Sequence, residues 1–289
     1  METDIRLCQL TSLRVGGTPL CYFHPRDKAA LLDALAECRR MRLPWRVLGG
    51  GTNLLVDEGV LPYAVIHVAA PGFSSIERIP EGVRVGAGTP TAEVLGYCRR
   101  EGLGGLEFLA ALPGTVGGAV VGNAGAWGRE ICQQVRSVWT VSPEGREVLM
   151  HPSNLSFSYR CSNLEGAVVT QVELELAPRD AELVALQIGE YARRRMGRHP
   201  MSEPSAGCVF KNPPGASAGK LLDLCGFKGA RVGGAQVSDC HANFVLNTGN
   251  ATARDILTLI RLMRTEVLRR FGIELELEVR HWPSHSKVA

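Results

Sequence analysis

A thiol, an ammonium group and a carboxamide lie close together in residues 204–213, PSAGCVFKNP, as Cys208, Lys211 and Asn212. The two flanking prolines fix φ and remove two backbone donors, and Gly207 permits backbone geometry that a side chain would block. Such a stiff segment suits a site that holds a small anionic substrate and gives it a proton. The alternative is a loop around a buried, inert cysteine, because free cysteine is among the most buried residue types.

An arginine and a row of glutamates are further candidates for this chemistry. Arg160 ends the apolar and aromatic segment LSFSYR, where it is either a surface charge or a cation with planar donors for a carboxylate. Near the C-terminus, residues 273–280 alternate apolar and polar, which predicts a strand with Glu274, Glu276 and Glu278 on one face. An exposed edge is the ordinary interpretation of that face. Spacing does not say which carboxylate would turn into a pocket.

One glycine-rich turn suits a ligand with phosphates, and a second strand also ends in glycines. Residues 49–53, GGGTN, follow a predicted strand, and successive glycine amides can form a nest for a pyrophosphate; a hairpin turn is the alternative. Leu54 stands where the last glycine of a dinucleotide fingerprint would be, and a strand rather than a helix follows. Residues 82–88 form a second strand that ends in glycines, with Thr91 in the third glycine's place. A classical Rossmann fold is therefore disfavoured.

The stretch from Gly104 to Gly128 is the most unusual in the chain, because nearly every side chain after Gly114 is small. Small residues allow a helix to pack closely on a neighbour. Each glycine nevertheless costs roughly 0.5–1 kcal/mol relative to alanine in regular structure. A compensating ligand, such as a flat ring system lying on this surface, is the better explanation.

These segments need a framework of mixed helices and strands. Apolar periodicity, capping residues and glycine or proline terminators predict helices over 27–41, through 94–98, and over 180–195, 217–225 and 252–271. Strands are predicted at 20–23, 45–48, 82–86, 135–141, 147–149, 167–176, 241–247 and 273–280. The pattern is that of an α+β protein.

Composition narrows the function classes. At 289 residues the chain is long for one hydrophobic core, so two or three lobes are expected. A net charge of +3 without a basic arm makes nucleic acid an unexpected partner. Nine cysteines without a C-x-x-C pair indicate neither a disulfide framework nor a metal site, and no apolar run is long enough to span a membrane. We expect a cytoplasmic, reduced protein.

Six motifs in order resemble one family, the UDP-N-acetylenolpyruvoylglucosamine reductases. The motifs are VLGGGTNLLV (47–56), LPGTVGG (112–118), NAGAWG (123–128), YR (159–160), GCVFKNP (207–213) and LEVR (277–280). The resemblance runs from about Thr11 to Arg280, and it fits the shorter second subclass, because little more than one helix lies between Leu176 and Arg193. Six separated motifs in sequence are far more specific than any one of them.

The resemblance implies a flavoprotein of the para-cresol methylhydroxylase type in bacterial peptidoglycan precursor synthesis. Two α+β lobes, residues 1–66 and 67–180, would hold non-covalent FAD, and an α+β domain of residues 181–289 would bind the substrate. NADPH would reduce FAD, which would then reduce the enolpyruvyl ether of UDP-N-acetylglucosamine to UDP-N-acetylmuramate. No nucleic-acid or membrane partner is expected.

The resemblance also assigns roles to individual residues. It assigns catalysis to Arg160, to Cys208 as the proton donor, and to Glu278. Many family members have serine where this chain has Cys208, and a thiol, with an ordinary pKa of about 8.5, is a stronger acid than an alcohol. The resemblance assigns FAD binding to Gly49, Gly50, Gly51, Thr52, Asn53, Leu54, Pro113, Gly114, Thr115, Gly117, Gly118, Asn123, Ala124 and Gly125. It assigns substrate binding to Tyr159, Lys211, Asn212 and Lys228.

Two other functions are compatible with parts of the sequence. One is another flavin oxidase or dehydrogenase of the same fold, in which FAD is often attached covalently through His or Cys; His24 follows a strand but carries no motif for that chemistry. The other is a flavin-binding module without turnover, which would lack Arg160, Cys208 and Glu278. The sequence does not decide whether NADPH or NADH is the reductant, what the oligomeric state is, or whether Ser205 instead of Cys208 donates the proton.

Overall fold

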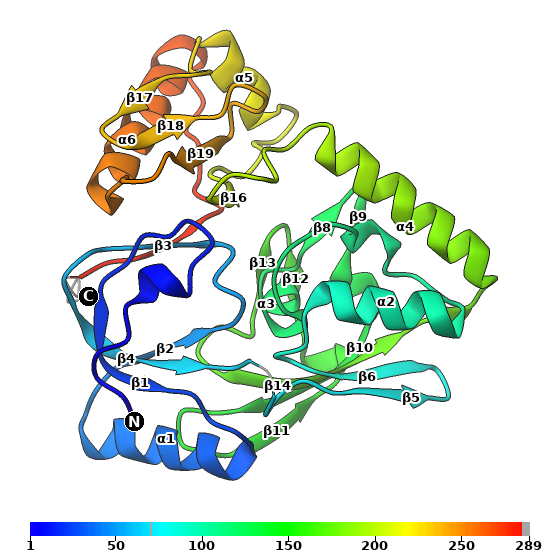
Figure 1. Cartoon of the computed structure of the whole chain (residues 1–289). Helices are drawn as coiled ribbons and strands as arrows, with labels where there is room; N and C mark the ends of the chain where they lie inside the picture. Colours follow the sequence, from blue (N-terminus) through cyan, green and yellow to red (C-terminus); the bar gives the residue numbers. More distant parts are fainter. Residues whose placement is uncertain (70, 285–289) are drawn as a thin grey trace. The chain divides into compact units, whose positions relative to one another are not determined.

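The computed structural model describes residues 1–69 and 71–284 and divides into two compact units (Figure 1). Unit 1 comprises Met1, Cys21–Gly50 and Tyr63–Arg195; unit 2 comprises Glu2–Leu20, Gly51–Pro62 and the described residues from Met196 onward. Each unit therefore takes segments from separate parts of the chain. The three-lobe division at residues 66 and 180 stays a prediction.

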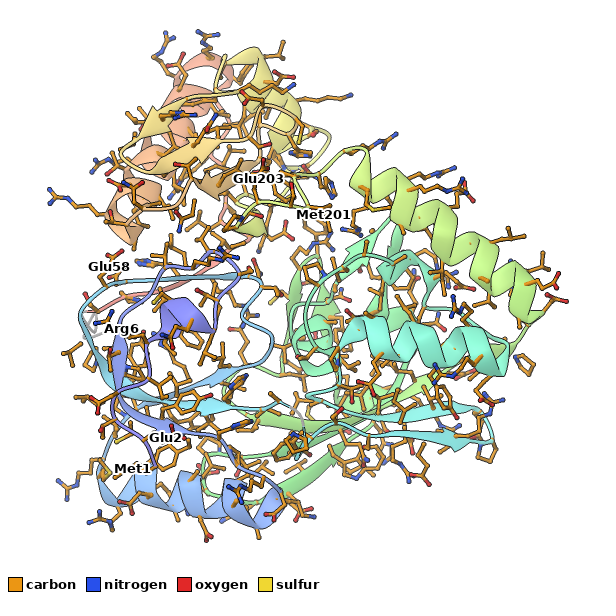
Figure 2. The ribbon with its side chains drawn as sticks, viewed as in Figure 1. Met1, Glu2, Arg6, Glu58, Met201 and Glu203 are labelled. Carbon is orange, nitrogen blue, oxygen red and sulfur yellow. The ribbon has the colours of Figure 1, made fainter. Side chains whose placement is uncertain are left out.

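The structure confirms every predicted helix and adds α3, which lies in the glycine-rich stretch and was not predicted. The helices are α1 (Lys28–Arg40), α2 (Thr91–Glu101), α3 (Val116–Val121), α4 (Ala181–Met196), α5 (Ala218–Leu224) and α6 (Ala253–Phe271), with 3-10 turns at Leu7–Gln9, Glu107–Leu109, Ile131–Gln133 and Pro152–Asn154. Local capping explains the limits of α6. The Thr252 hydroxyl accepts the Asp255 N–H, and Gly272 ends the helix in the left-handed region at φ 67°. The carboxylate of Glu58, labelled in Figure 2, also accepts the Ala253 N–H.

Unit 1 is built on a five-stranded antiparallel sheet in the order β11-β10-β14-β6-β5. These strands are Glu147–Met150, Val135–Val141, Val168–Glu175, Gly82–Gly86 and Ile76–Ile79. Helices α2 and α3 lie on one face of the sheet (Figure 1). The core beneath them includes Val85, Val120 and Val172, each fully buried. Burial of such apolar faces is what holds the layers together.

A second sheet, in the order β1-β4-β2, carries the first glycine turn. Its strands are β1 (Thr18–Phe23), β4 (Val60–His67) and β2 (Trp45–Leu48), and β2 and β4 are parallel with Leu48 opposite His67. Short pairs complete unit 1: β7 (Leu103–Gly104) with β15 (Ala177–Pro178), β8 (Gly125–Ala126) with β9 (Arg129–Glu130), and β12 (Phe157–Ser158) with β13 (Cys161–Ser162).

Unit 2 packs α5 and α6 against an antiparallel sheet in the order β16-β19-β18-β17. The strands are Ser205–Cys208, Phe244–Asn247, Ala235–Val237 and Arg231–Val232. The apolar stripe of α6, with Ile256, Ile260 and Met263, is buried in this core. A parallel pair joins β3 (Leu54–Val56) to β20 (Arg280–Trp282). Residues far apart in sequence thus meet within one unit.

The predicted strand over 273–280 is wrong in its bounds, because only Arg280–Trp282 is a strand. The alternation itself is present: Leu275 and Val279 are buried, whereas Glu274 and Glu276 are exposed. Leu277 pairs with Phe210 in an isolated bridge, so this segment is not part of a continuous ladder. An alternating pattern describes an extended backbone, and a strand also needs a partner.

Candidate active site

Two glycine segments that the sequence singled out approach each other in unit 1: the first glycine turn, at Gly49–Gly50, and a second glycine turn, at Gly114–Thr115, within the stretch from Gly104 to Gly128. A Cβ on Gly50 would lie 2.9 Å from Cα of Gly114, and one on Gly49 would lie 2.8 Å from Oγ1 of Thr115. Side chains at either glycine would therefore push the turns apart. The close approach brings two glycine backbones together, and successive backbone amides in such turns can bind phosphates.

Helix α3 begins directly after the second turn. The Thr115 hydroxyl caps it by accepting the Gly118 N–H at 3.4 Å. Gly117 is explained by packing, since a Cβ there would lie 2.8 Å from Cβ of Ala87 and its N–H donates to the Ala87 carbonyl. Gly118 is exposed. Of this pair, only Gly118 is accessible for contact with a ligand.

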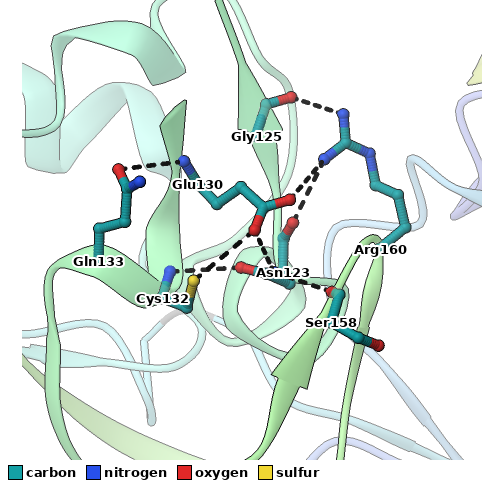
Figure 3. Close-up of polar contacts among 7 residues, drawn as sticks. All are labelled: Asn123, Gly125, Glu130, Cys132, Gln133, Ser158 and Arg160. Carbon is teal, nitrogen blue, oxygen red and sulfur yellow. Dashed lines mark hydrogen bonds and ion pairs between the residues drawn. The ribbon is translucent and has the colours of Figure 1, made fainter. Parts of the chain in front are cut away.

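Asn123 is fully buried and connects three segments (Figure 3). Its Nδ2 donates to the Glu130 carboxylate and to the Ser158 carbonyl, both at 2.9 Å, and its Oδ1 accepts the Cys132 N–H at 3.3 Å. Its φ of 42° lies in the left-handed region, which asparagine tolerates better than most residues. Its side chain thus serves the local structure, whereas the sequence resemblance assigned the residue to FAD.

The Arg160 guanidinium is held above this network. Nη2 donates to the Gly125 carbonyl at 2.8 Å, Nη1 to the Asn123 carbonyl at 3.4 Å, and Oε1 of Glu130 lies 3.9 Å away (Figure 3). The guanidinium also lies over the Tyr159 ring, 4.8 Å from its centroid. Two carbonyls and an aromatic face orient the guanidinium, whose planar donors suit a carboxylate.

Cys208 is the last residue of β16 in unit 2 and is half-buried opposite Phe244. The preceding Gly207 has φ 76°, and a Cβ there would meet no atom within 4 Å. Glycine is therefore required for its conformation and not for space. Beyond Cys208, the buried Asn243 side chain fixes Phe210 by accepting its N–H at 3.0 Å and donating to its carbonyl at 2.8 Å.

Glu278 is brought beside Cys208 by backbone pairing. The carbonyl of Val209 accepts the N–H of Glu278 at 2.8 Å, and the Lys211 N–H donates to the Glu276 carbonyl at 2.9 Å. From the other side, Asn53 Nδ2 donates to the Glu278 carbonyl at 3.1 Å. The exposed Glu274 and Glu276 pair with Arg264 and Lys211, whereas Glu278 is half-buried. Backbone pairing and burial thus distinguish Glu278 within the predicted row.

The proposed substrate residues of unit 2 have structural contacts of their own. Asn212 Oδ1 accepts the Ala218 N–H at 3.0 Å at the start of α5. Lys211 lies 3.4 Å from the exposed Glu276 carboxylate, and Lys228 lies 2.9 Å from that of Asp223. Exposed ion pairs are weak, so both ammonium groups can exchange these partners for phosphate. Tyr159 and Arg160 belong to unit 1, whereas Cys208, Glu278 and these residues belong to unit 2.

Comparison with known proteins identifies the family. Residues 199–282 match the model described as the C-terminal domain of UDP-N-acetylenolpyruvoylglucosamine reductase, and residues 19–150 match the FAD binding domain. UDP-N-acetylenolpyruvoylglucosamine reductase 2 of Symbiobacterium thermophilum is 42% identical over 94% of this chain and 89% of its own. The chain belongs to the UDP-N-acetylenolpyruvoylglucosamine reductase family.

Further members of the reductase family agree. The reductase of Moorella thermoacetica is 41% identical over 97% of this chain and 92% of its own. The crystal structure of the reductase from Thermus caldophilus superposes with a TM-score of 0.84 at 38% identity, covering 98% of this chain and all of that one. The predicted family and its fold are thereby confirmed, and the matched domain makes FAD the cofactor.

The residues of unit 1 fit the FAD of this reductase family. The Gly49–Gly50 and Gly114–Thr115 turns leave no room for side chains where their backbones meet, as a pyrophosphate cradle requires. The exposed Pro113 and Gly118 flank the second turn. Gly51 has a different role, because a Cβ there would lie 2.0 Å from the Leu10 carbonyl within unit 2.

Sequence reasoning missed the residues that hold the candidates in place. Glu130 anchors Asn123, and Asn243 fixes the backbone after Cys208. His67 lies opposite Leu48, the residue before the first glycine turn. None of these residues belongs to a local motif, so the sequence carries no signal for their roles.

No helix in residues 1–69 and 71–284 has the length and apolar character to cross a membrane.

Proposed function

We propose that the chain catalyses the NADPH- and FAD-dependent reduction of UDP-N-acetylglucosamine enolpyruvate to UDP-N-acetylmuramate, a step of peptidoglycan precursor synthesis. Membership of the reductase family supports the reaction, and the observation that carries the site assignment is the pairing of Cys208 and Glu278 through Val209. The nine cysteines without paired spacing favour a reducing compartment, so the proposal places the reaction in the cytosol.

Arg160 binds and neutralises the substrate carboxylate in this mechanism. FAD supplies the reducing equivalents, which it takes from NADPH. Addition of a hydride to the methylene carbon of the enolpyruvyl group moves negative charge towards the carboxylate. A guanidinium held by the Asn123 and Gly125 carbonyls is already oriented, so little reorganisation is needed when that charge develops.

Cys208 then donates the proton that completes the reduction. Its Sγ–H bond breaks, the proton goes to the carbon next to the carboxylate, and the thiolate regains a proton from water. Glu278 faces the same developing charge, and as a bare carboxylate it would repel it. It therefore acts in its protonated form or through a hydrogen-bonded neighbour. Glu278 is held by its backbone bonds to Val209 and Asn53.

Substrate recognition is assigned to four side chains. Lys211 and Lys228 supply charge for the diphosphate, and Tyr159 lies beside Arg160. Asn212 supplies a carboxamide next to Lys211.

The resemblance assigns FAD contacts to Gly49–Leu54, Pro113–Thr115, Gly117, Gly118 and Asn123–Gly125. Of these residues, Gly51 and Gly117 are explained by packing within the chain, and Asn123 can offer only its backbone in this side-chain arrangement.

Anaerobic half-reactions test the proposal. NADPH should bleach the flavin spectrum of the purified protein, and the enolpyruvyl sugar should restore it. In Cys208→Ala, bleaching should persist and recovery should be lost, whereas Cys208→Ser should keep substantial recovery. Ser205→Ala serves as the matched control and tests the alternative donor.

Three results would contradict the assignments. Equal loss of both half-reactions in Cys208→Ala would remove the proton-donor role. Loss of recovery in Ser205→Ala alone would transfer that role to Ser205. Bleaching by NADPH without recovery by the enolpyruvyl sugar in the wild type would reject the substrate and point to another flavoenzyme reaction.

A further inference from the structure

The loop formed by residues 10–15 lies against strand β16 within unit 2. Leu13 and Val15 are buried in the core of this unit together with Ala206 of β16. Asn247 of β19 holds the loop in place, because its Nδ2 donates to the Leu13 carbonyl at 3.0 Å. The catalytic scheme uses no residue of this loop.

Strand β16 is an edge of its sheet, so one side of its backbone has no neighbouring strand of that sheet. On the inner side, the Pro204 carbonyl accepts the Asn247 N–H at 2.9 Å. Successive carbonyls of a strand point to opposite sides, so the next carbonyl, that of Ser205, points away from β19. The Ser12 hydroxyl donates to this carbonyl at 2.6 Å. The loop therefore supplies the bond that a further strand would have made.

Ser12 also holds Gly51, the residue that follows the first glycine turn. The Ser12 N–H donates to the Gly51 carbonyl at 3.0 Å, and the Ser12 hydroxyl lies 3.4 Å from the same oxygen. A hydroxyl has one hydrogen to donate, and the shorter contact assigns it to Ser205. One residue thus holds Gly51 by its amide and Ser205 by its side chain, and all three residues belong to unit 2.

The bond to Ser205 stands at the start of a β-bulge that ends at Cys208. Ser205 pairs with Leu246 and Cys208 pairs with Phe244, so β16 takes three steps where β19 takes two. A bulge bends its strand and redirects the side chains that it carries. The direction of the Cys208 side chain therefore depends on how the two ends of the bulge are held.

The far end of the bulge is fixed by backbone bonds. After Cys208, the Val209 N–H donates to the Asn243 carbonyl at 2.8 Å, and the Val209 carbonyl accepts the Glu278 N–H at 2.8 Å. Within the bulge, Gly207 has φ 76° and a Cβ there would meet no atom within 4 Å, so packing around a side chain does not restrain it. The position of the bulge thus depends on the restraint at its start.

We propose that Ser12 is a positioning residue for proton donation: it sets the strand that carries Cys208 relative to Gly51, the residue after the first glycine turn. The Ser12 hydroxyl fixes the start of the bulge, and the Ser12 amide fixes Gly51. This inference rests on the proposed role of Cys208 as the proton donor.

Anaerobic half-reactions of the full-length holoprotein test the proposal. In Ser12→Ala, NADPH should bleach the flavin at the wild-type rate, because that step needs no proton from Cys208. Reoxidation by the enolpyruvyl sugar should slow about 3- to 10-fold, the rate equivalent of one neutral hydrogen bond. Ser12→Thr keeps the hydroxyl and should restore most of the rate.

Thr140→Val is the matched control for a general loss of stability. The buried Thr140 hydroxyl donates to the Val148 carbonyl at 3.3 Å in the sheet of unit 1, and valine replaces that hydroxyl by a methyl group. Both variants should unfold at lower urea concentration than the wild type, yet only Ser12→Ala should slow reoxidation. Equal slowing of reoxidation in both variants would reject the positioning role.

Hydrogen exchange of the flavin-stripped protein gives a readout that does not depend on turnover. The backbone amides of residues 205–208 should exchange faster in Ser12→Ala than in the wild type, because the start of the bulge has lost a restraint. Their exchange should be unchanged in Thr140→Val. Unchanged exchange in Ser12→Ala would overturn the inference.

The wild type and Cys208→Ala separate this inference from the function on which it rests. A wild-type flavin that the enolpyruvyl sugar does not reoxidise would overturn the proposed reaction and the role of Ser12 with it. Equal loss of both half-reactions in Cys208→Ala would do the same for the proton donor. Normal reoxidation in Ser12→Ala, with reoxidation lost in Cys208→Ala, would retain the proposed function and reject the role of Ser12 alone.

Discussion

Removal of the Asn123 side chain should loosen the segment that carries Arg160. In Asn123→Ala the Ser158 carbonyl, the Glu130 carboxylate and the Cys132 N–H lose their bonds to the Asn123 side chain (Figure 3). Each such hydrogen bond contributes about 0.5–1.5 kcal/mol. Alanine at a φ of 42° adds about 1 kcal/mol of backbone strain. The free energy of unfolding should therefore fall by about 2.5–5.5 kcal/mol.

Asn163→Ala is the matched control for this prediction. Asn163 directly follows the β12–β13 hairpin that carries Ser158; it is exposed and hydrogen bonds to Ser156 and Asn154. Removing its side chain should lower the free energy of unfolding by less than about 1 kcal/mol. Urea denaturation followed by circular dichroism compares the two variants. Because Arg160 is proposed to bind the enolpyruvyl substrate, Asn123→Ala should slow reoxidation of the flavin and spare its reduction by NADPH. Equal destabilisation by both variants, or equal slowing of both half-reactions, would refute the reasoning.

Three further perturbations have defined outcomes. The pKa of His67 is about 4 in the folded chain and about 6.5 in the unfolded chain, so the unfolded state binds the proton first as pH falls. Relative to His67→Gln, the free energy of unfolding of the wild type should therefore fall by up to about 3 kcal/mol between about pH 6.5 and pH 4. Urea denaturation at each pH measures this difference, and a difference that does not change with pH would contradict the assignment. Iodoacetamide should inactivate the wild type but not Cys208→Ser, and mass spectrometry at pH 8 should find Cys98 unmodified, because burial raises its pKa to about 12. Gly207→Ala should lower the free energy of unfolding by about 1–2 kcal/mol, since a Cβ fits but φ is 76°; a stabilised variant would be inconsistent with that conformation.

Much of the local structure could be predicted because its causes are local. Asp27 caps α1 and Thr252 caps α6. Gly272 ends α6 directly after residue 271, the last residue of the predicted helix. The strand Trp45–Leu48 was predicted with the bounds that the structure has. Caps, apolar periodicity and glycine terminators act within about one turn of the chain, so the sequence carries them directly.

The predicted strand over 273–280 failed for the opposite reason. Its alternation correctly placed Leu275 and Val279 inside, yet most of the segment lacks a continuous ladder. Pairing depends on the conformation of the Val209–Lys211 backbone, far away in sequence. A period of two fixes which side chains are buried, and it leaves the partner undetermined.

The sequence by itself determined the family, the helices and the residue types of the site, since these follow from ordered motifs and local propensities. The tertiary structure alone singled out Glu278 from three alternating glutamates, committed the Asn123 side chain to Ser158, Glu130 and Cys132, and placed His67 beside Tyr22. The bond from Asn53 to Glu278 spans 225 residues. Such contacts depend on how distant segments pair and pack, and no pattern within either segment specifies them.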